Sequence, residues 1–258
     1  MKLSDFRVLT FDCYGTLIDW ETGLYAALQP LLRAVNTPLG REQALAQFAQ
    51  HEAAQQAATP DMLYPELLAE VHRRLARQWG VTLAPADHVA FGTSVPRWPA
   101  FADTPAALQY LKRHYKLVIL SNVDRESFAG SNVKLGVGFD AICTAQDIGS
   151  YKPDPRNFRY LIDTLAKLGF GRQQILHTAQ SLYHDHVPAR ALGLASAWID
   201  RRHERQGWGA TLPPAGTPAY DFRFESLADM VAGHQRELQG CPKRGAFLLT
   251  ARRAVAPG

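Results

Sequence analysis

A short apolar run near the N-terminus ends in a carboxylate. Val8–Phe11 is a run of four mostly apolar residues, Asp12 follows it directly, and Gly15 lies in the turn beyond. This pattern predicts a buried strand of a parallel sheet, and ligands of such sheets bind at the carboxyl ends of the strands. A carboxylate held there needs cations or hydrogen-bond donors around it, which later segments must supply. From this stretch alone, a structural turn cap and a catalytic residue explain Asp12 equally well.

Further apolar runs follow in the second half of the chain, with helix-like segments between them. The predicted strands are Lys116–Leu120, Phe139–Thr144, Ile175–Ala179, Ala195–Ile199 and a short strand from Phe222. Strands that alternate with helices in this way predict a parallel, doubly wound α/β sheet. Residues 20–92 instead carry leucines and aromatics at helical spacing, without a strand pattern. We therefore predict an α/β core, residues 1–19 and 93–240, with an inserted α-helical cap, residues 20–92.

Composition and charge narrow the classes of function. A hydrophobic content of 47% and a formal net charge of +4 describe an ordinary folded globule with a mildly basic surface. No long basic run or nucleic-acid-binding motif is present, so we expect a small anionic substrate and no nucleic acid. No apolar run reaches membrane-spanning length and no signal pattern is present, so we expect a cytoplasmic protein without a membrane partner. Three scattered cysteines fit free thiols, and the basic stretch 241–258 is expected to form a disordered tail.

Polar residues follow the predicted strands at the edge where Asp12 lies. They are Ser121 and Asn122 after the second strand, Lys152 after the third, and Gln180, Ser181 and Asp185 after the fourth. Parallel strands carry their carboxyl ends to one edge, so we expect these loops to converge. Two carboxylates, an ammonium and several hydroxyl and amide donors form a coherent hydrolytic set. Taken singly, Lys152 is also explained as a surface ion pair and Asp185 as a helix cap.

The order of these segments resembles the haloacid dehalogenase (HAD) superfamily. The resemblance lies in Phe11–Leu17, Leu120–Asn122, Tyr151–Pro155 and the Ser181–Asp185 region, with a helical insertion where the superfamily's type 1 cap lies. Phosphatases of the superfamily carry a general acid two residues after the nucleophile. This chain has Tyr14 at that position, as is typical of type II L-2-haloacid dehalogenases, in which a halide leaves without a proton.

The resemblance implies a hydrolase that works through an aspartyl ester. Asp12 would attack carbon, most directly that of a 2-haloalkanoate, and water would then cleave the ester. Lys152 would keep Asp12 ionised, and Asp185 would orient or deprotonate the water. The implied substrate-binding residues are Tyr14, Thr16, Ser121, Asn122, Gln180 and Ser181. Dimerisation through the cap is common in the family and implies a homodimer by analogy only.

Metal use follows from the same resemblance. Phosphatases of the superfamily bind magnesium with a further carboxylate of the fourth motif, where this chain has Gln180. Mg²⁺ prefers several anionic oxygens in an octahedral array. We therefore expect no required metal or other cofactor, while Asp12 and Asp185 leave a weak Mg²⁺ site open.

The chain departs from the dehalogenases in its substrate pocket. Those enzymes carry an arginine on an early cap helix, whereas the corresponding stretch Ala46–Glu52 has none, and its His51 and Glu52 are expected to face solvent. Phe158 replaces the family's tyrosine, and Leu182 replaces the asparagine of the fourth motif. A ring-opening hydrolase, a magnesium-dependent phosphatase of a small metabolite, and a carboxylate-binding relative without dehalogenase activity stay open as alternatives.

Overall fold

Six strands form one fully parallel sheet in the computed structural model, which describes residues 1–216 and 218–240. The strands are β1 Val8–Phe11, β2 Lys116–Ser121, β3 Ala141–Thr144, β4 Ile175–Ala179, β5 Ala195–Ile199 and β6 Phe222–Phe224. Their order is β3-β2-β1-β4-β5-β6, and each neighbouring pair is parallel. β1 is therefore an inner strand, with β2 on one side and β4 on the other. The predicted doubly wound α/β fold is confirmed.

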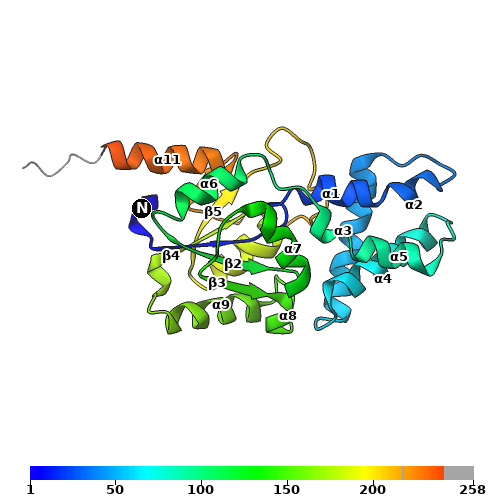
Figure 1. The fold of residues 1–258 in the computed structure, drawn as a ribbon, viewed down its shortest axis with the longest axis horizontal. Coiled ribbons are helices and arrows are strands. Elements are labelled where there is room, and N and C mark those ends of the chain that lie inside the picture. The colour runs from blue at the N-terminus through cyan, green and yellow to red at the C-terminus, as the bar shows by residue number, and fades with distance from the viewer. Residues whose placement is uncertain (217, 241–258) are drawn as a thin grey trace, which may run out of the picture.

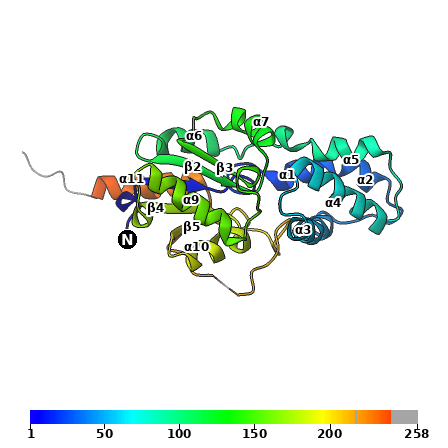
Figure 2. The ribbon, with the colours of Figure 1, turned by 90° about the horizontal axis from the view of Figure 1, so that it is seen from below.

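Helices cover both faces of this sheet (Figures 1 and 2). They are α6 Thr104–Leu111, α7 Arg125–Leu135, α8 Ala145–Ile148, α9 Pro155–Lys167, α10 Val187–Ala191 and α11 Leu227–Gly240. Because side chains alternate along a strand, Leu9 and Leu117 pack with α6 and α11, whereas Val8 and Val118 pack with α9 on the other face. Burial on both faces explains why these strands read as continuous apolar runs.

The insertion between β1 and β2 is helical, as predicted. It contains α1 Trp20–Ala27, α2 Gln29–Arg33, α3 Arg41–Ala58, α4 Tyr64–Gln78 and α5 Pro85–Gly92. These helices lie beyond the end of the sheet to which β1 runs, opposite the N-terminus and α11 (Figure 1). Leu24 and Phe48 of the insertion belong to the same buried cluster as Leu9 of the sheet. The boundaries of the cap at residues 20 and 92 stay a prediction, because one apolar core runs through both parts.

One helix start differs from the sequence prediction. The sequence Thr59-Pro60-Asp61 has the pattern of a helix start, with proline after a capping residue, but α4 begins at Tyr64. The Met62 N–H donates to the Thr59 carbonyl at 3.1 Å and closes a turn there. Pro65 then lies in the first turn of α4, where its missing N–H leaves no helical hydrogen bond unmade.

Close packing of α5 on α4 provides a test of the cap. A Cβ atom at Gly92 would lie 2.2 Å from the Pro65 carbonyl oxygen, which is part of the backbone and cannot rotate away. Gly92→Ala should therefore lower the free energy of unfolding by about 1–3 kcal/mol, measured by urea denaturation. Gly138→Ala is the control, because no atom lies within 4 Å of a Cβ built there. Equal losses in the two variants would show that the α4–α5 contact is not tight.

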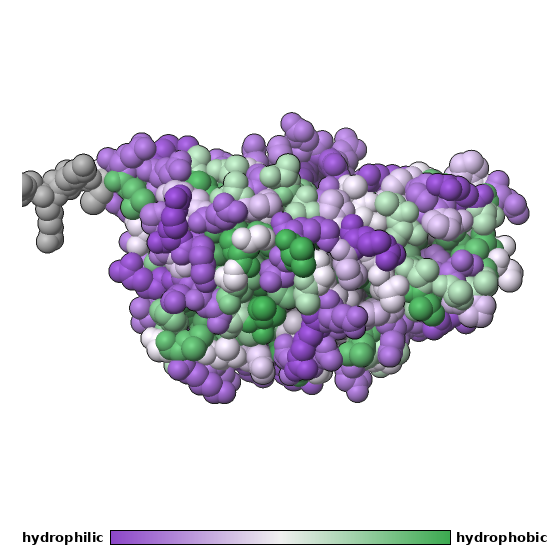
Figure 3. All heavy atoms as spheres, viewed as in Figure 1, coloured by the Kyte–Doolittle hydropathy of each residue, from purple (hydrophilic) through white to green (hydrophobic). Residues whose placement is uncertain are grey.

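Several further expectations concern the surface and the termini. No helix in the described ranges is long and apolar enough to cross a membrane. On the face shown in Figure 3, apolar side chains are scattered among polar ones. Cys13 and Cys143 are buried free thiols. The predicted tail at residues 241–258, with Cys241, lies outside the described residues.

Candidate active site

The turn after β1 presents Asp12 at the carboxyl edge of the sheet. The Asp12 N–H still donates to the Thr178 carbonyl of β4, at 3.1 Å. Gly15 then takes a φ of 95°, a left-handed conformation that favours glycine. This lets the chain fold back, so that the N–H groups of Leu17 and Ile18 both donate to the Cys13 carbonyl. Asp12 is thus fixed by the sheet on one side and by a tight turn on the other.

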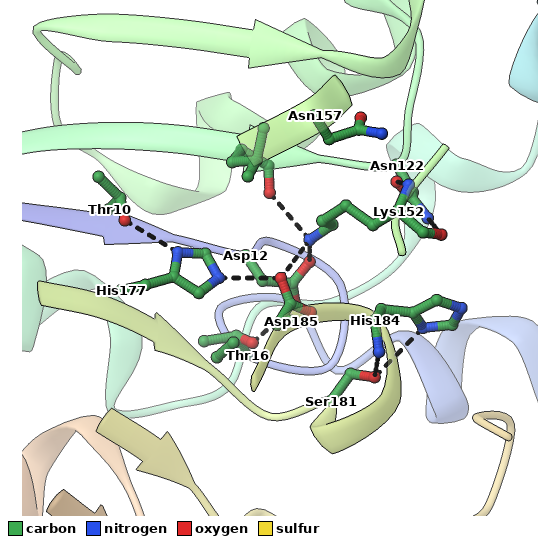
Figure 4. Close-up of polar contacts among 12 residues, drawn as sticks. Thr10, Asp12, Thr16, Asn122, Lys152, Asn157, His177, Ser181, His184 and Asp185 are labelled. Carbon is green, nitrogen blue, oxygen red and sulfur yellow. Dashed lines mark hydrogen bonds and ion pairs between the residues drawn. The ribbon is translucent and has the colours of Figure 1, made fainter. Parts of the chain in front are cut away.

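Lys152 joins Asp12 to Asp185 (Figure 4). Its Nζ lies 2.9 Å from Asp12 Oδ1 and 2.6 Å from Asp185 Oδ1. The third hydrogen of the ammonium goes to the Leu120 carbonyl at 3.0 Å, which uses all three donors. The side chains of Lys152 and Asp185 are each 1% exposed, and that of Asp12 is 9% exposed. Burial of an unpaired charge is very costly. These three charged groups offset that cost by pairing with one another in the interior.

The two carboxylates differ in their other hydrogen bonds. Asp185 Oδ1 also accepts from His177 Nε2–H at 2.9 Å, because an ionised carboxylate can only accept. His177 Nδ1 in turn accepts from the Thr10 hydroxyl at 2.8 Å. Asp12 receives one further side-chain hydrogen bond, from the Thr16 hydroxyl to Oδ2 at 2.7 Å. Asp185 is therefore the more firmly held anion.

The pKa values of the two carboxylates differ in the same sense as their hydrogen bonding. Burial acts to raise the pKa of Asp185, but Lys152 and His177 outweigh it and hold that pKa far below its ordinary value. Burial raises the pKa of Asp12, and Lys152 lowers it without cancelling the effect of burial, so the pKa stays above its ordinary value. Lys152 thus acts to favour ionised Asp12, but burial is the larger effect. Asp12 is therefore the less stabilised and the more exposed of the two carboxylates.

Asn122 and Thr16 position these charged groups. The Lys152 N–H donates to Asn122 Oδ1 at 2.7 Å, and Asn122 Nδ2 donates back to the Lys152 carbonyl at 3.0 Å. The Thr16 hydroxyl, besides donating to Asp12, accepts from the Gln180 N–H at 2.9 Å. Ser121 Oγ is buried and has no hydrogen-bond partner among the described residues. A direct contact of these three side chains with substrate stays a prediction.

A small cavity lies between this cluster and the cap. From the core it is lined by Asp12, Tyr14, Asn122, Lys152, Ser181, His184, Asp185 and Thr211, and from the cap by Trp20, Glu52, Gln56 and Tyr64. Its volume is about 40 Å³. That is room for about two or three water molecules, or for a substrate of a few heavy atoms. Gln180 lines a separate cavity with Trp198 and Arg202.

Tyr14 forms a wall of the cavity. Its hydroxyl is hydrogen bonded to Ser131 Oγ at 3.0 Å, and its ring packs edge-on against Trp98. Burial raises the pKa of Tyr14 well above its ordinary value, so the phenol is neutral and does not supply a matched acid. The residue thus gives the pocket an aromatic surface beside the nucleophile.

Sequence reasoning missed His177 and misplaced Glu52. His177 lies inside an apolar strand, in register with Thr10 of β1, and a polar pair on two buried strands is the signal that could have found it. Glu52 does not face solvent as predicted: it is 4% exposed and lines the cavity. It lies four and seven residues after Phe48 and Leu45, on the buried stripe of α3.

The donor set fits Mg²⁺ poorly. The Oδ1 atoms of Asp12 and Asp185 are both held by Lys152, and Asp12 Oδ2 accepts from Thr16. Of the four oxygens, Asp185 Oδ2 has no hydrogen-bond partner within residues 1–216 and 218–240. In the same ranges no group of three or more His, Cys, Asp or Glu residues could hold a metal ion. Binding of Mg²⁺ by both carboxylates through these oxygens would require them to give up hydrogen bonds to Lys152 or Thr16, so the arrangement fits this ion poorly.

The chain resembles a known protein family. The model of the family described as "Hydrolase: haloacid dehalogenase-like hydrolase" matches residues 6–177. None of the curated protein sequences matches the chain.

Solved structures match over most of the chain. The L-2-haloacid dehalogenase PA0810 is 26% identical, with a TM-score of 0.71 over 91% of this chain and 99% of that one. The defluorinating L-2-haloacid dehalogenase Rha0230 is 21% identical, with a TM-score of 0.72, and the match covers 91% of this chain and 98% of that one. The HAD-hydrolase YfnB from Bacillus subtilis, bound to magnesium, is 18% identical, with a TM-score of 0.70 over 89% and 99%. Because the family match covers more than half of the chain, the protein belongs to the haloacid dehalogenase-like hydrolases.

Proposed function

We propose that this hydrolase displaces a leaving group from carbon through an ester on Asp12, with a small 2-haloalkanoate as substrate. The observation that carries the proposal is the unequal pair of carboxylates on Lys152: both line the cavity, and Asp12 is the more exposed of the two. Tyr14 in place of an acid supports a leaving group that departs without a proton. The dehalogenases PA0810 and Rha0230 share the fold.

The two half-reactions use the residues already placed. A carboxylate oxygen of Asp12 attacks the carbon, the carbon–halogen bond breaks, and halide leaves with the bonding electrons. Water then attacks the ester carbonyl carbon and gives its proton to Asp185, whose Oδ2 has no partner among the described residues. The acyl–oxygen bond breaks, the leaving alkoxide takes up the second proton of the water, and the 2-hydroxyalkanoate departs. The proton on Asp185 passes to solvent, and Asp12 is restored as a carboxylate. Lys152 neutralises the charge that develops on the ester oxygen.

A phosphatase is the second candidate, because YfnB, with the same fold, binds magnesium. Against it stand Gln180, which lines another cavity, and the few free carboxylate oxygens around Asp12. A cytoplasmic location and a dimer through the cap stay predictions from the sequence.

Halide release separates the candidates. With EDTA present, the enzyme should release halide from L-2-chloropropionate or chloroacetate together with an equal amount of 2-hydroxyacid, measured by ion chromatography. The matched assay supplies small phosphate monoesters with and without added Mg²⁺. Phosphate release that requires Mg²⁺, with no halide from any haloacid, would establish the phosphatase and refute our proposal.

A further inference from the structure

The cap contributes a carboxyl group to the active-site cavity where the dehalogenases are expected to contribute a cation. Glu52 of α3 is 4% exposed and lines the same cavity as Asp12. Among the described residues it forms no ion pair, and its hydrogen-bond partner is the neutral Tyr64 hydroxyl. The one basic side chain lining the cavity with a permanent charge, Lys152, is fully engaged by Asp12, Asp185 and a carbonyl.

Tyr64 determines which oxygen of Glu52 can carry a proton. The Tyr64 hydroxyl donates to Glu52 Oε1 at 2.7 Å. No described residue bonds to Oε2, so in the neutral acid the hydrogen is placed on Oε2. A neutral Glu52 then offers one O–H donor for a molecule in the cavity.

The surroundings favour the neutral acid up to about neutral pH. Burial raises the pKa of Glu52 to about 7, and the Tyr64 hydrogen bond lowers it by less. The titratable groups nearby are Tyr64 on α4, Tyr151 and Lys152 on the loop before α9, Asp12 and Tyr14 on the β1 loop, and His184 and Asp185 after β4. Burial raises the pKa of Tyr151 and lowers that of His184 to about 4, so both are neutral at pH 7.

We propose that Glu52, as a neutral acid, binds the substrate's carboxylate by donating the hydrogen on Oε2. This inference rests on the proposed function for the identity of the substrate. An ionised Glu52 would repel the same anion, because the cavity would then hold three carboxylates and one ammonium. Glu52 therefore determines substrate specificity, because the site binds a carboxylate when Glu52 carries a proton.

Binding of a carboxylate should accordingly take up a proton. A group with a raised pKa is protonated below about pH 7 and loses its proton as the pH rises through that value. Affinity should be constant below about pH 6 and fall by about tenfold per pH unit above about pH 8. A substrate anion beside the acid raises its pKa further, so proton uptake should begin near about pH 7 and approach one proton per bound ligand above about pH 8.

The test measures binding without turnover. Propionate, which has no leaving group, is titrated calorimetrically into the wild-type protein from about pH 6 to about pH 9, in two buffers of different ionisation enthalpy. The wild type should bind more weakly as the pH rises and should take up a proton. Glu52→Gln keeps a neutral donor, so its affinity should not change with pH and proton uptake should vanish. Glu66→Gln, at an exposed position of α4, is the matched control and should behave as the wild type.

A second variant tests the same assignment if Glu52→Gln folds poorly. Tyr64→Phe removes a donor that stabilises ionised Glu52, so the fall in affinity should move to higher pH. Unchanged pH dependence in both variants, or no propionate binding by the wild type at pH 6, would overturn the inference. Failure of halide release with pH-dependent propionate binding intact would refute the proposed function and leave the role of Glu52 standing.

Discussion

Asp12→Asn should lower kcat/KM for a 2-haloalkanoate by about 10⁴–10⁶-fold, the scale seen when a catalytic nucleophile is removed. An amide is a poor nucleophile toward carbon, so the ester on which the second half-reaction depends does not form. The fold should survive, because asparagine has nearly the same shape and can still accept from Lys152 through its carbonyl oxygen. Asp61→Asn, at an exposed position of the cap, is the control and should keep full activity.

The ester itself can be identified. In a single turnover in ¹⁸O-labelled water, water attacks the ester carbonyl, so the label should first enter the Asp12 side chain rather than the product. Mass spectrometry of the Asp12 peptide detects this label, and intact mass checks that the asparagine of the variant has not hydrolysed back to aspartate. Label that enters the product directly, or full activity of Asp12→Asn, would exclude Asp12 as the nucleophile.

Lys152→Met should abolish activity and lower the free energy of unfolding by about 3–5 kcal/mol, as expected when one partner of a buried ion pair is removed. Burial lowers the pKa of Lys152, but the two carboxylates outweigh this and raise it above its ordinary value. In the variant, Asp12 and Asp185 would face each other without a cation between them. The pKa values of both carboxylates would rise above those in the unfolded chain. The free energy of unfolding of the variant should therefore fall as the pH rises through the pKa values of its folded state.

The stability defect should therefore be larger at about pH 8 than at about pH 4.5, where one carboxylate can take up a proton. Urea denaturation at both pH values measures it, with Lys167→Met at an exposed position of α9 as control. An equal loss at both pH values would show that packing of the lysine stem, rather than its charge, stabilises the site.

The strand and the turn that hold Asp12 could be predicted, because their sequence pattern has one physical explanation. β1 is apolar on both faces and ends at a carboxylate and a glycine turn, so its place within the sheet follows from sequence. Lys152 could be assigned from the order of the loops. For Gln180, the N–H donates to the Thr16 hydroxyl and the residue lines a second cavity, and its contact with substrate stays a prediction.

The burial of Glu52 could not be predicted from the sequence. α3 is rich in alanine and glutamine, and a charged residue on such a helix normally faces water. Its burial comes from the cap packing over the core loops, which residues distant in sequence determine. The four-residue spacing from Phe48 puts Glu52 on the buried stripe of α3, and the hydrogen bond from the Tyr64 hydroxyl offsets part of the cost of burying its carboxyl group.

The polar contacts of the site form a ring that the backbone from Thr10 of β1 to Asp12, directly after β1, closes. From Thr10 they pass to His177 across the β1–β4 register, then through Asp185 and Lys152 back to Asp12, two positions beyond the start. A slip of β1 by one residue would turn Thr10 to the opposite face and open the ring. Each of its members belongs to the sheet or to a loop that follows a strand, and none to the cap. The hydrogen bonds that hold Asp12, Lys152 and Asp185 in place therefore do not depend on side chains of the cap.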